Sequence, residues 1–477
     1  MALDRVDPED ELALSEDDLR RVIDDPRERA HIGAQTLADA FLRRIERLNP
    51  ALNAILTSTP EVAAADARRV EDARAAGQPL PLDGMPIVLK DNIDLGGVRC
   101  TAGSKAFADR IAERDAFVVE RLRAAGAVVI AKAHLHEFAY GATSNSAFGA
   151  ARNPWDPSRI PGGSSGGSGA AIAADLTIGA LGTDTGGSVR MPSAFNGVTG
   201  LRPTIGGVSN RGVYPLAASL DTVGPMARSA ADVRALFASM KAFDSGDPWS
   251  REAADRVSGT RSEIRGLRIG IVEEFFFDDA DPQIVDRIAD AVDVLRDFGA
   301  SVVPFRIPGI AEAYHSCTLL MRAEAAALHE HRIDDERVPI GDDVRGRLRL
   351  GRDVTGIELA RVLAHRMQWR RELACILSRD VDALLTPAIA VPTPLIEGTD
   401  MLSTTTLLTR MTLPWSFAGI PAISIPCGFR SDGMPVGMQI AAAPWQDDRT
   451  IDIAEAYQSA TDWHRRRPAH PFVADSK

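Results

Sequence analysis

The chain has 477 residues, a net charge of −12 and 45% hydrophobic residues. This composition is typical of a folded globular protein and excludes both a disordered and a membrane-embedded chain. The acidic balance argues against a nucleic-acid-binding surface, because phosphate contacts need clustered Lys and Arg. No apolar run reaches the roughly 20 residues that span a bilayer, and the acidic start lacks a signal-peptide core. We therefore expect a cytoplasmic protein with no membrane partner.

Cysteine and histidine spacing gives no sign of a bound metal. The four cysteines are widely separated and form no C-x-x-C pair. His134 and His136 would share one face of a strand, but no third ligand is near them in sequence. We expect four free thiols, no metal and no cofactor.

The first elements expected along the chain are helices. Apolar residues at helical spacing are Leu37, Phe41, Ile45 and Leu48. Asn49-Pro50 should stop this helix, and an alanine-rich helix should follow over about 61–76. Residues 85–90 then form a short apolar run that ends on Lys90, which predicts a buried strand with a charge at its tip.

Helices and strands alternate from there onward. A helix within 114–125 is closed by Gly126 and followed by a strand at 127–130. A strand at 267–272 precedes a helix that begins at Asp281-Pro282. Further short strands are expected at 301–303, 383–385 and 422–425. This alternation predicts an α/β fold, with a large mixed, mostly parallel central sheet covered by helices on both faces.

We expect a single domain over residues 1–477. It should comprise an N-terminal helical region (about 10–80), a core (about 81–235) and a more variable region (about 240–400). The charged segment 245–265 is the best candidate for an exposed connection.

Glycines concentrate in residues 161–200, which hold 11 of the chain's 39. Glycine is used where φ must be positive or where backbone must approach closely, and three interpretations compete. A phosphate cradle is the first, but the loop lacks the Lys-Ser/Thr ending of a Walker loop and a GxGxxG placed after a strand. The second is a nucleophile elbow centred on Ser165, since residues 163–167 satisfy G-x-S-x-G.

That elbow needs an acid and then a histidine downstream. The downstream histidines are His315, His329, His331, His365, His464 and His470. None of these histidines lies in a loop whose sequence suggests that it would orient the imidazole.

The third interpretation takes the whole segment 161–204, PGGSSGGSGAAIAADLTIGALGTDTGGSVRMPSAFNGVTGLRPT, as one motif. This segment closely resembles the signature of the amidase signature family, and the resemblance extends over nearly the whole chain. Other matching segments are LRRIERLNPALNAIL, LDGMPIVLKDNID, HEFAYGATSNSAFGAARNPWD, SLDTVGPMARSAADV, FAGIPAISIPCGF and DGMPVGMQIAAAPW. The resemblance implies the amidase signature fold and hydrolysis of a linear amide C–N bond.

By motif, the resemblance implies that Ser188 is the nucleophile, that Ser164 is a bridging serine preceded by a cis peptide bond, and that Lys90 is the base. Ser164 and Ser188 are 24 residues apart. A serine hydroxyl is a poor nucleophile unless a base accepts its proton. A lysine can be that base only when neutral, and burial at the end of an apolar strand lowers its pKa.

Further roles follow from the same motif. The backbone N–H groups of Thr185, Gly186, Gly187 and Ser188 are expected to form an oxyanion hole. Asp184 and Arg190 match signature positions and are interpreted as a structural ion pair, with Ser165 as a supporting residue.

The substrate prediction depends on one departure from the family's pattern. Glutamine-dependent amidotransferase subunits carry an aspartate five residues before the proline that is Pro414 here, where it receives the ammonium of glutamine. This chain has Thr409 at that position. We therefore predict an amidase of the non-glutamine type that cleaves a small-molecule aryl or alkyl amide, an ester or a carbamate (urethane). The prediction includes no nucleic-acid partner and leaves a homodimer open.

The alternative is a glutamine-dependent amidotransferase subunit that acts with partner subunits on tRNA.

The residues expected to line the substrate pocket are Tyr140, Arg211, Thr409, Trp415 and Phe417. An apolar wall of this kind suits an aryl or alkyl group. The loop over about 206–216 is the expected substrate-specificity loop, with Arg211 as its gate residue.

Overall fold

The computed structural model describes residues 14–252 and 264–469. The acidic first residues, and residues 253–263 of the charged segment predicted as a connection, lie outside the described residues. Within the described ranges, no helix has the length and apolar character needed to cross a membrane.

The strands are β1 (Ile55–Ser58), β2 (Pro86–Lys90), β3 (Val128–Ala133), β4 (Asn145–Ser146), β5 (Gly149–Ala150), β6 (Gly179–Asp184), β7 (Thr199–Arg202), β8 (Thr222–Ala227), β9 (Arg268–Val272), β10 (Ser301–Phe305), β11 (Ala383–Pro387), β12 (Ala422–Phe429) and β13 (Pro435–Ala441). The helices are α1 (Glu16–Asp24), α2 (Pro26–Arg29), α3 (Ala34–Leu52), α4 (Pro60–Ala75), α5 (Phe117–Ala124), α6 (Gly166–Ala173), α7 (Arg190–Asn196), α8 (Ala230–Met240), α9 (Pro282–Asp297), α10 (Ile310–Ile333), α11 (Asp342–Arg352), α12 (Gly356–Arg379), α13 (Met401–Thr409), α14 (Leu413–Ala418) and α15 (Asp447–Ala460).

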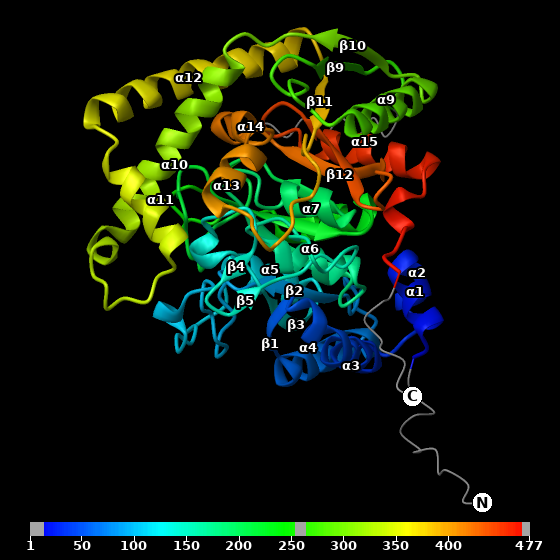
Figure 1. Cartoon of the computed structure of the whole chain (residues 1–477). Helices are drawn as coiled ribbons and strands as arrows, with labels where there is room; N and C mark the ends of the chain where they lie inside the picture. The colour runs from blue at the N-terminus through cyan, green and yellow to red at the C-terminus, as the bar shows by residue number, and fades with distance from the viewer. Residues whose placement is uncertain (1–13, 253–263, 470–477) are drawn as a thin grey trace, which may run out of the picture.

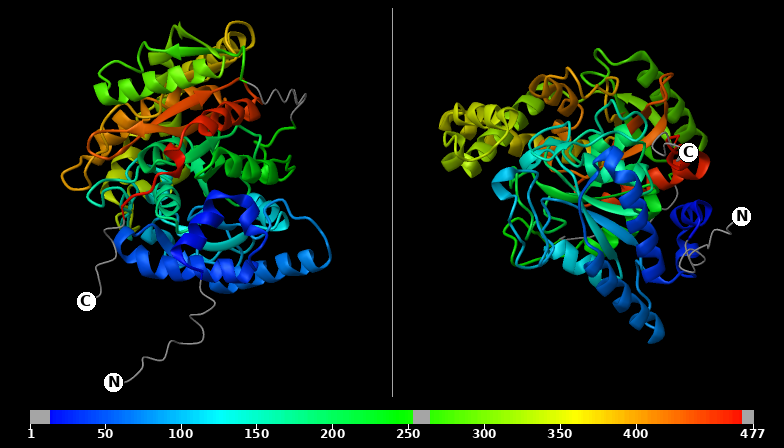
Figure 2. Two further views of the ribbon diagram at one scale, coloured as in Figure 1. Left: turned by 90° about the vertical axis from the view of Figure 1, so that its right-hand side faces the viewer. Right: turned by 60° about the horizontal axis from the view of Figure 1, so that its bottom comes forward.

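One large mixed sheet organises the described part of the chain, and the expected α/β fold is confirmed. Eleven strands pair in the order β1-β3-β2-β6-β8-β7-β12-β13-β11-β9-β10. Figure 2 shows this order as a succession of colours through the molecule, from the blue N-terminal elements at one end to β9 and β10 at the other.

Parallel and antiparallel pairs occupy different parts of the sheet. The strands β3-β2-β6 and β11-β9-β10 are parallel, whereas the pairs from β6 through to β11 are antiparallel. Antiparallel neighbours such as β12 and β13 need only a short turn, here residues 430–434, whereas parallel strands need a crossover.

Most elements begin and end close to their predicted positions. The strand expected at 85–90 is confirmed as β2, which is buried along its whole length, and the helix expected over 61–76 is α4. The predicted stop of the first helix at Asn49-Pro50 is wrong, because α3 continues to Leu52. A proline in the last turn removes only one N–H donor, and Asn53, with a φ of 48°, then closes the helix by donating to Asn49 O at 2.7 Å.

Strand β6 is packed tightly on both of its faces, and glycine makes this possible. A Cβ atom at Gly179 would lie 2.9 Å from Leu236 of α8, and one at Gly182 would lie 2.7 Å from the hydroxyl of Ser165, just before α6. Because strand residues three apart point to opposite faces, α8 and α6 cover opposite faces of the sheet. The glycine-rich segment thus lies directly against β6.

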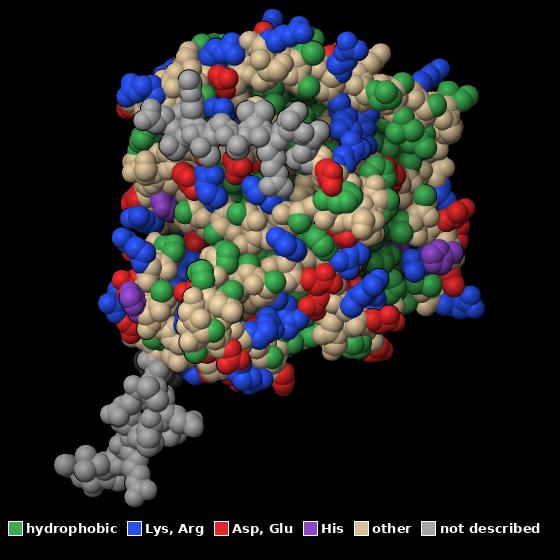
Figure 3. Space-filling model, turned by 180° about the vertical axis from the view of Figure 1, so that it is seen from behind, with side chains coloured by type: hydrophobic (Ala, Val, Ile, Leu, Met, Phe, Trp, Pro, Cys, Tyr) green, Lys and Arg blue, Asp and Glu red, His purple; other side chains and the backbone are tan. Residues whose placement is uncertain are grey.

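Helices α10, α11 and α12 form a lobe beside the sheet (Figure 1). A second hydrophobic cluster fills this lobe and includes Trp369 of α12 and Trp415 of α14, both fully buried. Figure 3 shows the face that is turned away from the viewer in Figure 1, where Lys and Arg side chains are interspersed with Asp and Glu, without one broad patch of either sign.

Candidate active site

Lys90 ends β2 inside the protein. Its side chain is fully buried, and Nζ donates hydrogen bonds of 2.7 Å to both Ser164 Oγ and Thr183 Oγ1. Burial lowers the pKa of Lys90 from 10.5 to about 7, although the negative charges of Asp184 and Asp221 raise it. The predicted strand-end lysine is therefore poised to lose its proton near neutral pH.

Ser164 lies next to Lys90, two residues before the start of α6. The Gly163–Ser164 peptide bond is cis, as the resemblance predicts. A Cβ at Gly163 would lie 2.7 Å from the backbone of Ala142, so only glycine allows this close approach. The Ser164 carbonyl accepts the N–H of His136 at 3.1 Å, which fixes the segment before α6.

Ser188 follows β6 and precedes α7. Its side chain is 6% exposed, and its hydroxyl makes no hydrogen bond to another described residue. The Ser188 carbonyl accepts the N–H of Ser165 at 3.2 Å, so the two predicted serine segments are adjacent. The structure thus brings Lys90, Ser164 and the Ser188 loop together from three separate parts of the chain.

The loop from Thr185 to Ser188 offers backbone donors, but one of the four expected donors is already used. Gly187 N–H donates to Asp184 Oδ1 at 2.9 Å, which removes it from the predicted oxyanion hole. The N–H groups of Thr185, Gly186 and Ser188 have no acceptor among the described residues. Three donors therefore remain available for a developing negative charge.

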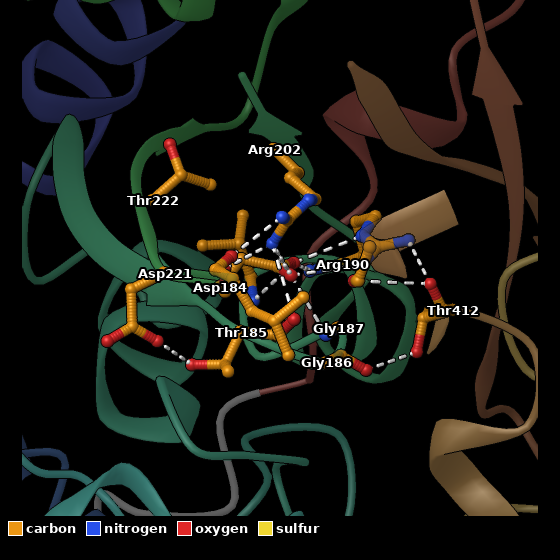
Figure 4. Close-up of polar contacts among 12 residues, drawn as sticks. Asp184, Thr185, Gly186, Gly187, Arg190, Arg202, Asp221, Thr222 and Thr412 are labelled. Carbon is orange, nitrogen blue, oxygen red and sulfur yellow. Dashed lines mark hydrogen bonds and ion pairs between the residues drawn. The ribbon is translucent and has the colours of Figure 1, made fainter. Parts of the chain in front are cut away.

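Gly187 itself is required by this loop. Its φ is +121°, and a Cβ atom there would lie 2.2 Å from the hydroxyl of Thr412. The same hydroxyl donates to the carbonyl of Gly186, as Figure 4 shows. Thr412 therefore packs directly against the loop from the C-terminal half of the chain.

Asp184 is the centre of a buried ionic network (Figure 4). The predicted pair is present, with Arg190 Nη2 at 3.0 Å from Asp184 Oδ1, and Arg202 Nη1 lies 2.9 Å from the same oxygen. All three side chains are fully buried. Burial alone would raise the pKa of Asp184, but the charges of the two arginines hold it well below its ordinary value.

Ser165 has a structural position. Its hydroxyl donates to Thr183 O at 3.2 Å and accepts Thr183 N–H at 3.3 Å, so it ties the start of α6 to β6. This position excludes the nucleophile elbow, because the Ser165 hydroxyl is fully buried and bonded to backbone. The phosphate cradle also fails, since residues 160–205 are buried throughout.

The expected pocket residues separate into two groups. Trp415 and Phe417 are fully buried, and Trp415 stacks on Phe276 with ring centroids 5.3 Å apart, so both belong to the core. Tyr140 and Thr409 both lie near α13. Thr409 is the last residue of that helix, and Arg347 donates both to Tyr140 O and to Thr405 of α13. The expectation of an aromatic wall built from Trp415 and Phe417 is therefore not met.

A cavity of about 200 Å³ adjoins the base on another side. It is lined by Thr183 and Asn92, both hydrogen-bonded near Lys90, and by residues of the predicted substrate-specificity loop, including Arg211 and Tyr214. Arg211 is held by Asp244 at 2.8 Å and by Glu120 at 3.1 Å, so in this structure it is anchored.

Sequence reasoning did not find Arg347, which lies in an arginine-rich stretch of α11 without a motif. It is 3% exposed and donates to Tyr140 O and to Thr405 Oγ1, the latter at 3.1 Å. Its Nε has no acceptor among the described residues. Thr409, one turn along α13, donates to Thr405 O at 2.8 Å, so Arg347 and Thr409 lie close to the same residue.

His136 lies between this arginine and Ser164: its Nε2 is 3.4 Å from Arg347 Nη1, and its backbone N–H donates to Ser164 O. Burial lowers the pKa of His136, the charges of Arg347 and Lys90 lower it further, and Asp343, 2.9 Å away, raises it. His134 instead contacts Ser146 at 3.1 Å. In the described ranges, no group of three or more His, Cys, Asp or Glu side chains is placed to hold a metal ion.

Comparison with known proteins identifies the family. A family model described as amidase matches residues 36–451. The chain belongs to the amidase family. It is 38% identical over 467 residues to a glutamyl-tRNA(Gln) amidotransferase subunit of Chloroflexus aurantiacus, covering 92% of this chain and 95% of that protein.

Solved structures of amidase relatives superpose over almost the full chain. A vestigial protein complex that reveals the evolutionary origins of an s-triazine catabolic enzyme has a TM-score of 0.84 and 33% identity, covering 90% of this chain and 96% of that one. A glutamyl-tRNA(Gln) amidotransferase subunit of Thermotoga maritima has a TM-score of 0.75 and 31% identity, covering 97% and 96%.

These relatives correct the substrate and partner predictions. We predicted an amidase of the non-glutamine type, cleaving an aryl amide or a urethane, with no nucleic acid and at most a second copy of itself as partner. The amidotransferase subunits that match almost the whole chain contradict that prediction. The error came from giving one position, Thr409, more weight than the rest of the chain.

The buried network provides a stability prediction. Asp184→Asn should leave Arg190 and Arg202 without their counter-charge, and breaking a buried pair in this way costs about 3–5 kcal/mol. Urea denaturation should therefore show a large fall in midpoint. Asp17→Asn removes the partner of Arg20 on the exposed face of α1 and should leave the midpoint unchanged within error. Equal midpoints for the two variants would contradict the network's structural role.

Proposed function

We propose that this chain is the glutamine-hydrolysing subunit of a tRNA-dependent amidotransferase. The observation that carries the proposal is the 38% identity to a glutamyl-tRNA(Gln) amidotransferase subunit over 92% of this chain. The reaction assigned to the site is cleavage of the glutamine carboxamide, which yields ammonia for a partner subunit and glutamate after hydrolysis.

The arrangement around Lys90 supports Ser188 as the nucleophile. Neutral Lys90 takes the proton of Ser164, and Ser164 takes that of Ser188 as its oxygen attacks the carboxamide carbon. When the C–N bond breaks, the proton returns through Ser164 to the leaving nitrogen, which departs as ammonia. A water molecule then hydrolyses the acyl-enzyme by the same route and frees the Ser188 hydroxyl.

The free backbone donors support the next step of the proposal. As the carbonyl carbon becomes tetrahedral, its oxygen gains negative charge and can accept from the N–H groups of Thr185, Gly186 and Ser188. Asp184 keeps the loop in shape by holding the Gly187 N–H. Such donors act without rearrangement, because the network around Asp184 has already fixed them.

Arg347 is our candidate for recognising the α-carboxylate of glutamine. It is buried and cationic, and its unpartnered Nε gives it a donor to spare. Guanidinium groups bind carboxylates with good geometry. Thr409 retains lone pairs on its hydroxyl, because that hydroxyl donates to Thr405 O, and it can therefore accept one hydrogen bond from the α-ammonium.

The charge of the chain supports a division of labour with a partner. The net charge is −12, and the face in Figure 3 carries mixed charges without a broad basic patch for RNA phosphates. In this proposal the partner subunit therefore supplies most tRNA contacts, and this chain supplies ammonia.

Ammonia release from glutamine tests the proposal directly. The chain, alone and with its partner subunits, should release ammonia from glutamine, and Ser188→Ala should reduce the rate by at least about 1000-fold. Ser193→Ala is the matched control, because Ser193 is a buried serine of α7 that donates to Val189 O at 2.8 Å. Glutamine left intact by the full complex, while another amide is cleaved, would refute the assignment.

A second prediction concerns the pH dependence. The pKa of Lys90 is lowered to about 7, and only its neutral form accepts a proton. The acylation rate should therefore be low below about pH 6, rise through about pH 7 and level off above about pH 8. Lys90→Ala should abolish the rate, whereas Lys105→Ala, at an exposed lysine, should not. Full activity of Lys90→Ala at neutral pH would show that the base is misassigned.

Thr409 provides a third prediction. Thr409→Asp should lower the KM for glutamine about 10-fold, because a charge-assisted hydrogen bond to the α-ammonium is roughly twice as strong as a neutral one. The same variant should leave the KM for glutaric acid monoamide unchanged, since that amide lacks the ammonium. Thr409→Asn serves as the uncharged control. Parallel changes for both amides would remove Thr409 from the ammonium side of the pocket.

A further inference from the structure

Asp221 is a buried carboxylate that the mechanism above does not use. It lies just before β8, is 6% exposed and lines the cavity beside Thr183. Its Oδ1 accepts a hydrogen bond from the hydroxyl of Thr185, the first residue of the oxyanion loop (Figure 4). Asp221 therefore contacts the loop through a side chain rather than through backbone.

The same carboxylate also holds the loop that lines the cavity. Asp221 Oδ2 accepts the N–H of Leu216 at 2.9 Å and that of Ala217 at 3.1 Å. One side chain thus joins the end of the predicted substrate-specificity loop to the oxyanion loop. A displacement of either loop would be transmitted to the other through these hydrogen bonds.

The segment that carries Asp221 is itself fixed by the helical lobe. Glu324 of α10 accepts Ser219 N–H at 3.0 Å, and Arg366 of α12 donates to Ser219 O at 2.6 Å. These bonds fix the segment that carries Asp221, so Asp221 can in turn set the position of Thr185.

We propose that Asp221 is a positioning residue that orients the oxyanion loop through Thr185 and couples it to the loop lining the cavity. This inference rests on the proposed function only in placing the reaction at Ser188. It assigns no substrate contact to Asp221.

The electrostatic surroundings of Asp221 give the proposal a distinctive readout. The charged groups that interact with it are Lys90 of β2 and Glu324 of α10, and Arg202 of β7 donates to the carbonyl of the preceding residue, Leu220. Burial raises the pKa of Asp221 to about 6, against the hydrogen bonds from Thr185, Leu216 and Ala217 that lower it. Above that pH it is ionised, and its charge raises the pKa of Lys90.

Asp221→Asn should therefore produce two changes together. The kcat should fall about 10- to 100-fold with little change in KM, because a misplaced oxyanion donor stabilises the transition state less but leaves substrate binding unchanged. The midpoint of the pH–rate profile should move to lower pH, because a negative charge that raises the Lys90 pKa has been removed. The midpoint reports the loss of the Asp221 charge near Lys90, whereas the fall in kcat at unchanged KM reports the displaced oxyanion loop.

Thr185→Val provides an independent test that leaves the bonds to Leu216 and Ala217 intact. It should reproduce the fall in kcat, and the double variant with Asp221→Asn should be no worse than the more impaired single variant, since both remove the hydrogen bond from the Thr185 hydroxyl to a charged carboxylate. Asp447→Asn is the matched control: Asp447 is also buried and accepts the Thr204 N–H and hydroxyl, each at 2.7 Å. It should lower thermal stability without moving kcat or the pH midpoint.

The experiment measures ammonia release by the full complex and, in parallel, the rate at which a fluorophosphonate probe labels Ser188. Labelling needs the oxyanion donors but no glutamine, so failure to hydrolyse glutamine and failure of this inference are distinguishable. Slower labelling of Asp221→Asn and Thr185→Val than of Asp447→Asn would support the proposal. Labelling rates within about 3-fold of wild type, or losses that multiply in the double variant, would overturn it.

Discussion

The carboxylate of Asp184 accepts hydrogen bonds from the backbone of its own loop and from two arginines, and the rest of the site depends on it. It binds the N–H of Gly187 and the guanidinium groups of Arg190 and Arg202. Arg190 then reaches Ser416 of α14 at 2.8 Å, and Arg202 reaches Leu220 O at 2.7 Å. Burying these charges is unfavourable unless each is paired and hydrogen-bonded, so the network is stable only when several distant segments are in place together.

The same network also governs the base. Lys90 is fully buried, and its pKa falls because water cannot reach its charge, while Asp184 and Asp221 act in the opposite direction. Two arginines bound to Asp184 hold the pKa of that carboxyl well below its ordinary value. Asp184 is therefore ionised throughout the pH range in which Lys90 loses its proton. The arginines thus keep this charge in place without touching the reacting atoms.

The sequence was sufficient to locate those site residues that belong to short local patterns. The strand ending at Lys90 follows from an apolar run, and Ser164 and Ser188 follow from the glycine-rich motif, because glycines mark a backbone that must pass close to other atoms. Arg347 was not found, since its role arises from contacts with Tyr140 and Thr405 and not from neighbours in sequence.

Two errors arose because a single residue was interpreted without its surroundings. An aromatic residue in a motif gives no sign of the direction in which it points, and Trp415 stacks on Phe276 in the core. Thr409 was given decisive weight because a single change of charge is easy to see, whereas similarity spread over the whole chain is not visible in one sequence. The mixed sheet was predicted, but its antiparallel middle was not, because pairing between β7 and β12 joins segments about 220 residues apart.

The position of Thr412 has a consequence for synthesis on the ribosome. Lys90, Ser164 and Ser188 all emerge in the first half of the chain, yet the loop bearing Ser188 is held by Thr412, and Arg190 donates to Thr412, Ser416 and Gln439 as well as to Asp184. A nascent chain that stops before these C-terminal residues carries all three side chains but not this support. We therefore expect the loop bearing Ser188 to reach its final geometry only late in translation.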